Sequence, residues 1–497
     1  MKKSRLTLVF DDASDAYLRL FVHALAQVPD DLRLTVSGAS IRPAEALIAA
    51  YGLGHRVDEA EPRSRPGPCQ SLREFREQLG GARHGDVAVR VPRESSYGRL
   101  SLADIVEALT LSDGSSRPPS PPPDLRGQRI ALITNIPNHY RAPLFNALAE
   151  RLAAAGATLL VLFLGHSYGR RAWVELPEMT FDHVFLTSVG VPMSRAWHPF
   201  IPRDLGKTLT GFGPTAVVCA GFSPLVAGRS ARIARRLGAR FGIWSGETST
   251  GITGSNRVRM LQRGRLLKRC DAALVYGSRA EEYVTALRPD LPAIHVRNTT
   301  PVADTVPRRT RDGRPIEILS VAEARSGKRL DLVIDAAAEC LDLDWHLTFV
   351  GDGPDRPALE ERAAPLGDRV TFTGAVPSSR VGEYYRKADI FMFPSEIDVF
   401  GLVVVEAFGS GLATLVSPDP GVVADLCASE VNSLVVPGRS PAEWGRYLRR
   451  VIEDDALRVG LAEAARRTIS NRWTIDHSVH AFTAGLRAVT GVHHEQR

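Results

Sequence analysis

The chain has 497 residues, of which 44% are apolar and 24% are charged, and its formal net charge is +6. This length gives room for two or three domains, and the composition is typical of a globular soluble protein. The charge excess is small and the basic residues are not interleaved with aromatics, which argues against a nucleic-acid-binding protein. No apolar run reaches about 18 residues and no secretory leader is recognised, so we expect a cytoplasmic protein without a membrane span.

The cysteines are dispersed and lack the paired spacing of a disulfide framework or a metal site, which favours a reducing compartment. They are Cys69, Cys219, Cys270, Cys340 and Cys427.

Residues 1–112 are predicted to form a small α/β extension with accessory or docking function. Its predicted strands lie at 6–10, 32–36 and 86–91, and its predicted helices at 15–26, 43–51 and 100–109. Asp11 and Asp12 follow the first strand, but no partnering His or acid stands at a telling distance, so we do not expect a metal site there.

Residues 113–127 are rich in Pro and Ser and too poor in apolar residues to pack, which predicts a linker. The linker separates the extension from a larger unit that we divide into domains at 128–305 and 306–480, followed by a tail at 481–497.

The first strand of the larger unit is predicted at 129–134, and the apolar spacing of 142–155 predicts a helix. Ligands bind outside the carboxyl ends of strands in open α/β sheets, so the loop between these elements is expected to face a cleft. Its polar residues are Asn138, His139, Tyr140 and Arg141. Two interpretations remain open: contact with a ligand, or bracing of the loop by Tyr140 and Arg141.

Two more predicted strands, 216–219 and 241–244, end in loops on the same side. Gly221 and Phe222 follow the first, and Glu247 follows the second. Glu247 is a candidate ligand contact, although a glutamate that only solvates the loop is nearly as good an interpretation.

Residues 257–269 are predicted to form a basic amphipathic helix. A solvated surface is the simpler interpretation, and attraction to an anionic membrane or ligand is the functional one.

The most informative segment is 393–417. A buried strand is predicted at its start, and an apolar helix opens near Gly401, where a ligand can approach the backbone. The unpaired N–H groups of a helix N-terminus attract phosphate. Asp398 and Glu406 are eight residues apart on this junction, so two carboxylates flank the anion-binding amides. A nucleotide-sugar, with phosphates in its middle and hydroxyls at both ends, fits this arrangement.

This segment resembles the donor-site motif of family-4 retaining glycosyltransferases, which have the GT-B fold of two Rossmann-like domains facing across a cleft. The family pattern is Glu, seven residues, Glu; this chain has Asp398 in the first position and Glu406 in the second. Lys328 matches the lysine that clamps the donor pyrophosphate. The family arginine is missing, and Arg325 in the same loop is a substitute candidate.

The resemblance runs through the domain at 306–480 and implies a retaining, metal-independent glycosyltransferase. The expected donor is UDP- or GDP-linked, no tightly bound cofactor is expected, and the acceptor is a small molecule, lipid or carrier-bound substrate. The implied catalytic residues are Asp398, Lys328, Arg325 and His139. The implied donor-binding residues are Glu406, Gly401, Leu402, Phe400, Val403, Gly374 and Val376. The implied acceptor-side residues are Asn138, Tyr140, Arg141, Gly221, Phe222, Glu247 and Asn298.

Two other functions stay open. The replaced Glu and the displaced arginine fit a catalytically silent homologue that binds nucleotide-sugar or activates a partner enzyme. A nucleotide-sugar epimerase of the same fold is a further rival, but it would not explain the acceptor-type loop at 135–141.

Overall fold

The structure is a computed structural model and describes a large part of the chain. The described residues are 4–9, 15–25, 27, 32–37, 48, 51, 53, 57–59, 86–90, 125–166, 178–190, 200–249, 257–302 and 313–491. The helix predicted at 100–109, most of the one predicted at 43–51 and most of the linker at 113–127 lie outside these residues. No helix in the described part is both long enough and apolar enough to cross a membrane.

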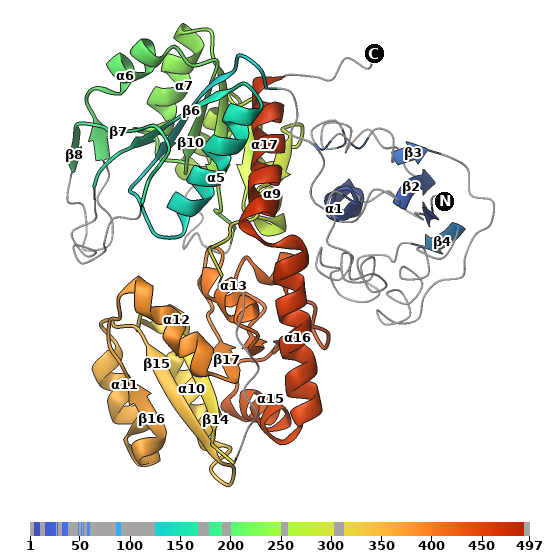
Figure 1. The fold of residues 1–497 in the computed structure, drawn as a ribbon, viewed down its shortest axis with the longest axis vertical. Coiled ribbons are helices and arrows are strands. Elements are labelled where there is room, and N and C mark those ends of the chain that lie inside the picture. Colours follow the sequence, from blue (N-terminus) through green and yellow to red (C-terminus); the bar gives the residue numbers. More distant parts are fainter. Residues whose placement is uncertain are drawn as a thin grey trace.

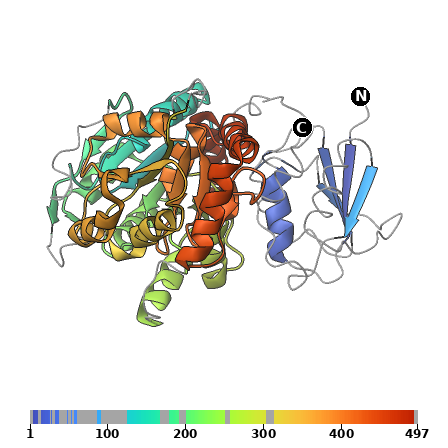
Figure 2. The same ribbon diagram turned by 90° about the horizontal axis from the view of Figure 1, so that it is seen from below.

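The N-terminal extension contains a parallel four-stranded sheet with strand order β3-β2-β1-β4. Its strands are β1 (Ser4–Val9), β2 (Leu32–Ser37), β3 (Val57–Glu59) and β4 (Asp86–Arg90). The three predicted strands are confirmed within two residues, and β3 was not predicted. Helix α1 (Asp15–Leu25) lies between this sheet and the rest of the molecule (Figure 2).

The next domain is built on a parallel seven-stranded sheet with strand order β13-β12-β11-β10-β5-β6-β7 (Figure 1). Its strands are β5 (Arg129–Thr134), β6 (Thr158–Phe163), β7 (His183–Phe185), β10 (Ala216–Ala220), β11 (Arg240–Ser245), β12 (Ala272–Val275) and β13 (Ala293–His295). Its helices are α5 (Arg141–Ala154), α6 (Leu205–Phe212), α7 (Ala227–Arg236), α8 (Arg257–Leu267) and α9 (Ser278–Leu287). Two short strands, β8 (Ser188–Gly190) and β9 (Phe200–Pro202), pair antiparallel.

The apolar patterns explain why these segments fold as they do. In β5, the residues from Ile130 to Ile133 are fully buried, as expected for a central parallel strand covered on both faces. In α5, the predicted spacing places Leu144, Phe145, Leu148 and Leu152 on the buried face.

The C-terminal domain has a parallel six-stranded sheet with strand order β16-β15-β14-β17-β18-β19. Its strands are β14 (Ile316–Val321), β15 (Trp345–Val350), β16 (Val370–Phe372), β17 (Ile390–Phe393), β18 (Ala413–Val416) and β19 (Leu434–Val435). Its helices are α10 (Leu330–Ala338), α11 (Arg356–Ala363), α12 (Ser378–Lys387), α13 (Leu402–Gly409), α14 (Val423–Leu426), α15 (Pro441–Glu453) and α16 (Asp455–Arg472). The strand-helix order predicted for this domain is confirmed.

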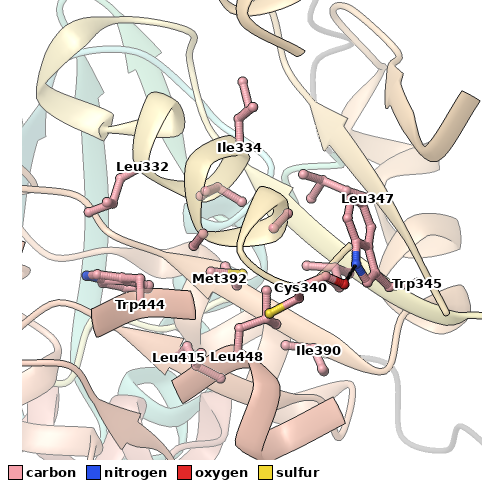
Figure 3. Packing of buried hydrophobic residues seen from close by; sticks show 14 of the residues in the cluster. Leu332, Ile334, Cys340, Trp345, Leu347, Ile390, Met392, Leu415, Trp444 and Leu448 are labelled. Carbon is pink, nitrogen blue, oxygen red and sulfur yellow. Dashed lines mark hydrogen bonds between the residues drawn. The ribbon is translucent and has the colours of Figure 1, made fainter. Parts of the chain in front are cut away.

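One core of the C-terminal domain packs α10 and α15 against the sheet (Figure 3). Its two tryptophans are buried with their N–H groups satisfied. Trp345 donates to the carbonyl of Cys340 at 2.7 Å, and Trp444 donates to the carbonyl of Gly438 at 3.0 Å. A buried indole without such a partner would carry a desolvation penalty.

The last helix, α17 (Ile475–Thr490), crosses back onto the seven-stranded domain and lies against α5 (Figure 1). Its residues Phe482, Leu486 and Val489 are buried in the same core as Leu132 of β5. Residues 481–490 are therefore not part of a tail, because they complete a domain whose other elements lie far earlier in the sequence.

The two large domains meet through a carboxylate placed at a helix N-terminus. Asp425 of α14 accepts hydrogen bonds from the Ser278 backbone N–H at 3.0 Å and from the Ser278 hydroxyl at 2.6 Å, at the start of α9. A negative charge is stabilised at this end of a helix. Gly277 is required there, since a Cβ would stand 2.0 Å from the Asp425 Oδ2. Arg279 adds a hydrogen bond to the carbonyl of Asp419.

The core of the C-terminal domain gives a direct stability prediction. Leu448 is fully buried, so Leu448→Ala removes packed methyl groups and should lower the free energy of unfolding by about 2–5 kcal/mol. Leu341→Ala is the matched control, because Leu341 is 51% exposed and its loss should cost less than about 0.5 kcal/mol. Chemical denaturation followed by tryptophan fluorescence measures both; equal destabilisation by the two changes would contradict this packing.

Candidate functional site

A cavity of about 570 Å³ lies between the two large domains. Most of its lining comes from three parts of the chain: the loop after β5, the segment between the domains, and the face of the C-terminal domain formed by α12 and α13. The lining residues are Ile136, Pro137, Asn138, His139, Tyr140, His166, Thr300, Pro301, Val302, Val321, Val376, Ser378, Ser379, Val381, Gly382, Tyr385, Arg386, Leu402, Val403, Glu406 and Ser410. The cavity therefore opens where the carboxyl ends of β5 and β14 face each other, as open α/β sheets predict.

Glu406 on α13 places a carboxylate in the wall of this cavity. The hydroxyl of Tyr385 on α12 donates to the Glu406 Oε2 at 2.8 Å. Burial raises the pKa of Glu406 to about 7, and the hydrogen bond from Tyr385 opposes this rise. Glu406 can thus change its charge near neutral pH, and its second oxygen is available to accept a hydrogen bond from a ligand.

The N-terminus of α13 lies beside this carboxylate. Gly401 precedes the helix with φ +97°, a left-handed conformation that side chains with a Cβ rarely adopt. Leu402 and Val403 in the first turn line the cavity. The sequence-based prediction of an anion at this place rests on the free N–H groups of a helix N-terminus and on the positive end of the helix dipole.

Lys328 and Asp398 are brought together by the structure. The Lys328 ammonium lies 2.5 Å from the Asp398 Oδ2 and donates to the carbonyl of Ile397 at 3.2 Å. The other oxygen of Asp398 accepts from the N–H of Phe400 at 3.0 Å. The pair is thereby fixed just before α13, although neither residue belongs to the cavity lining.

The two arginines near Lys328 are arranged differently from the expectation. Arg325, the candidate substitute for the family arginine, lies on the surface and pairs with Glu323 at 3.6 Å. Arg329 follows Lys328 directly and ion-pairs with Glu396, the acid two residues before Asp398. Arg329 is therefore the arginine adjacent to Lys328 in the sequence, and it was not among the predicted site residues.

Other donor-side candidates are brought into the same region. Gly374 forms an isolated bridge with Gly351, whose N–H donates to the Gly374 carbonyl at 3.0 Å. Val376 lines the cavity. Phe400 is buried and packs edge-on against Tyr276 of the other domain.

The loop after β5 divides into lining and bracing residues. Asn138, His139 and Tyr140 line the cavity. Arg141 instead donates to the Thr134 hydroxyl at 2.8 Å and to the Tyr276 hydroxyl at 2.9 Å. Arg141 therefore braces the loop, which is the second of the two interpretations left open by the sequence.

Three further acceptor-side candidates form a separate cluster outside the cavity lining. Glu247 ion-pairs with Arg263 of α8 at 2.7 Å, and the guanidinium of Arg263 lies 5.4 Å from the centre of the Phe222 ring. Burial raises the pKa of Glu247 and Arg263 opposes that shift. Gly221 lies next to Phe222 and has φ +77°.

Asn298 is also outside the cavity lining. It is buried, and its carbonyl accepts from the Trp473 indole at 3.1 Å. Its backbone thus joins the segment between the domains to the α16–α17 turn.

Several lining residues were missed by sequence reasoning. On α12, the residues Ser378, Val381, Gly382 and Tyr385 recur at helical spacing and face the cavity. That periodicity was visible in the sequence, but it is equally typical of a face packed on a core. His166 stacks on Phe185 at 3.9 Å and comes from a loop without a recognisable motif.

Comparison with known proteins identifies one domain of the chain. The family model described as Glycosyl transferases group 1 matches residues 304–468. D-inositol 3-phosphate glycosyltransferase of Salinispora arenicola is 33% identical over 201 residues, which are 36% of this chain and 45% of the relative. Alpha-D-kanosaminyltransferase of Streptomyces kanamyceticus is 32% identical over 174 residues, or 33% and 45% of the two chains. The chain thus spans about half the length of these relatives.

Solved structures agree on the fold. The lipopolysaccharide outer core galactosyltransferase WaaB superposes with a TM-score of 0.54 at 17% identity, covering 73% of this chain and 99% of that one. HepE of Anabaena, in complex with UDP and glucose, gives 0.54 at 14% identity and covers 70% and 96%. The fold is GT-B. Residues 304–468 are similar to glycosyl transferases group 1.

The matched range contains one half of the candidate site. Lys328, Asp398, Tyr385 and Glu406 all lie within the matched range. The loop at 136–140 lies outside it and contributes the opposite wall of the cavity.

The raised pKa of Glu406 predicts a stabilising substitution. An acid whose folded-state pKa exceeds its unfolded value of 4.5 lowers stability as the pH rises through the interval from 4.5 to about 7. Glu406→Gln keeps the acceptor for Tyr385 and removes the buried charge. We expect the variant to be more stable than the wild type at pH 8, by up to about 3 kcal/mol, and nearly equal at pH 4.5.

Denaturation at the two pH values tests this expectation. Glu361→Gln on the exposed side of α11 is the control and should change stability at neither pH. A Glu406→Gln protein that is no more stable than the wild type at pH 8 would show that burial of this carboxylate does not destabilise the folded state.

Proposed function

We propose that the chain is a retaining, metal-independent glycosyltransferase that moves a sugar from a nucleoside-diphosphate sugar to an acceptor. The observation that carries this proposal is the joint position of the Glu406 carboxylate and the first turn of α13 in one interdomain cavity. A hydroxyl-binding acid beside an anion-binding helix end matches the ribose and phosphates of a nucleotide.

In the proposed complex, Glu406 accepts hydrogen bonds from the ribose hydroxyls, and the amides around Gly401 and Leu402 hold the phosphates. Gly374 and Val376 lie on the side of the base. The donor that we propose is UDP- or GDP-linked, and HepE, a structural neighbour, is described in complexes with UDP and with UDP-glucose.

Breaking the sugar–phosphate bond leaves negative charge on the diphosphate, which must be stabilised in the transition state. We assign this role to Lys328 and the α13 N-terminus, with Arg325 or Arg329 as the accompanying arginine. Asp398 is proposed to orient the donor sugar, since its carboxylate is held beside Lys328.

The acceptor side is assigned to the loop after β5. His139 is the proposed acid-base or leaving-group contact, and Asn138 and Tyr140 complete the wall. The acceptor class we propose is a natural product, glycolipid, surface polysaccharide or carrier-bound substrate.

Peripheral membrane contact is proposed through α8. Val258 and Leu261 on this helix are each 60% exposed, and Arg257 and Arg259 beside them are exposed as well. Exposed apolar side chains among arginines suit the surface of an anionic membrane.

A second candidate function is binding without transfer. It is favoured by one observation, the departure of the site from the family pattern: Asp398 replaces a glutamate, and Arg325 is paired with Glu323 on the surface. Such a protein would bind nucleotide as tightly as an enzyme and release no product.

Nucleotide binding tests the donor site first. Glu406→Ala removes charge-assisted hydrogen bonds that are typically worth about 1.5–3 kcal/mol, so affinity for UDP or GDP should fall roughly ten-fold or more. Calorimetry on the wild type, Glu406→Ala and the exposed control Glu361→Ala measures the effect. Unchanged affinity in a folded Glu406→Ala protein would refute the assignment.

Transfer itself tests the chemistry. With Lys328 and the helix end meeting the leaving-group charge, product should form in excess EDTA and keep the anomeric configuration of the donor. The measurement is NMR of the product from UDP- and GDP-sugars offered with a panel of acceptors. An inverted product or a requirement for Mn²⁺ would contradict the mechanism, and nucleotide binding without any product would favour the silent homologue.

A further inference from the structure

Tyr385 and Glu406 face each other from two helices of the C-terminal domain. Tyr385 lies near the end of α12, Glu406 lies in the second turn of α13, and both line the cavity. The Tyr385 hydroxyl oxygen lies 2.8 Å from the Glu406 Oε2 and 3.3 Å from the carbonyl oxygen of Val403. A phenol carries a single proton, so the hydroxyl serves one of these two acceptors at a time.

The charge of Glu406 decides which acceptor the hydroxyl serves. An ionised carboxylate accepts a stronger hydrogen bond than a neutral carbonyl, so Tyr385 donates to Glu406 when the acid is ionised. When the acid is protonated, its own O–H can donate to the Tyr385 oxygen, and the phenol proton turns to the Val403 carbonyl. Both charge states are therefore hydrogen-bonded, and the ionised state has the stronger bond.

Tyr385 is a fixed donor. Its side chain is buried, and its ring lies 5.8 Å from the ring of Phe391 in β17. Burial, and then the nearby Glu406 carboxylate, raise the pKa of Tyr385 well above its usual value. The hydroxyl therefore keeps its proton throughout the pH range in which Glu406 titrates.

Other titratable and charged groups line the same cavity. They are His139, Tyr140, His166 and Arg386. Helix α16 packs on α13 through apolar residues such as Ala465 and Ile469, and its Arg466 lies beside Gly411, past the end of α13. Among the residues that the structure describes, Tyr385 is the one whose side chain hydrogen-bonds Glu406.

We infer that Tyr385 is a positioning residue of the donor site: its hydroxyl holds the Glu406 Oε2 in the ionised form and leaves Oε1 for the ligand. This inference rests on the proposed function, in which Glu406 binds the ribose. A hydroxyl donates a stronger hydrogen bond to an ionised carboxylate than to a neutral acid. Tyr385 therefore sets the lower pH limit for binding of a nucleotide-sugar.

The direction of the pH dependence follows from these contacts. Burial raises the pKa of Glu406 to about 7, and the hydrogen bond from Tyr385 lowers it. Since the ionised form binds the ribose better, the affinity of the wild type should rise up to about ten-fold between pH 6 and pH 8. Loss of the hydroxyl removes the lowering effect, so the pKa of Glu406 should rise further and binding should move to higher pH.

Denaturation of the unliganded full-length protein tests the hold on Glu406. Tyr385→Phe removes only the hydroxyl, and the lost hydrogen bond is to a charged group at pH 8 and to a neutral one at pH 5. The substitution should therefore increase the unfolding equilibrium constant by about five- to ten-fold more at pH 8 than at pH 5. In a Glu406→Gln background it should have the same effect at both pH values. An effect of Tyr385→Phe that does not depend on pH in the presence of Glu406 would overturn the inference.

Calorimetry tests the consequence for binding. UDP-glucose and GDP-glucose are suitable ligands, because their phosphates keep a fixed charge between pH 6 and pH 9. Tyr385→Phe should bind about ten-fold more weakly than the wild type at pH 6, and the difference should narrow as the pH rises to 9. Tyr384→Phe is the matched control: Tyr384 is the preceding residue of α12 and lies outside the cavity lining, so this variant should keep the wild-type pH dependence.

The two experiments separate this inference from the proposed function. A loss of affinity in Tyr385→Phe that is equal at every pH would show that Tyr385 only packs against α13, and it would overturn the inference while the donor site stands. A wild type that binds neither nucleotide-sugar would overturn the proposed function and the binding role of Tyr385 together. Denaturation would then still decide whether Tyr385 controls the charge of Glu406.

Discussion

The arrangement of the cleft depends on Asp425, whose carboxylate accepts hydrogen bonds at the N-terminus of α9. A carboxylate from one domain satisfies the free N–H of Ser278 in the other, so the two sheets are held with the carboxyl ends of their strands facing each other. The Asp425 carboxylate can come this close because Gly277 has no Cβ. This contact helps to fix the distance between the domains, so that the loop after β5 and the N-terminus of α13 contribute to one cavity.

Inside the cleft, the burial of one carboxylate lowers the stability of the protein at neutral pH. Glu406 is kept out of water on an apolar helix, and the Tyr385 hydroxyl compensates for only part of the lost solvation. Lys328 and Asp398, by contrast, satisfy each other, so the unliganded pair is stable as it stands. In the proposed complex, a ligand phosphate that approaches Lys328 has to compete with this carboxylate, so the loop before α13 has to rearrange.

The sequence predicted the parts of the site that short motifs specify. The strand, glycine and apolar helix around Gly401 are local features, and the eight-residue spacing of Asp398 and Glu406 follows from them. The contacts of long side chains were not predictable: Arg141 donates to Tyr276, a residue brought near only by folding, and Arg325 pairs with its sequence neighbour Glu323. Tyr385 was missed for the same reason, since its partner lies on a different helix.

The return of α17 to the seven-stranded domain affects the order in which the protein is completed during synthesis. Phe482, Leu486 and Val489 fill a core whose central strand, β5, is made some 350 residues earlier. Domains usually fold as they leave the ribosome, N-terminal first. Here the N-terminal half of the GT-B unit emerges with part of its apolar interior uncovered, and it stays so until the C-terminal domain has been translated. Nascent chains of this protein are therefore expected to need chaperone protection for as long as that interval lasts.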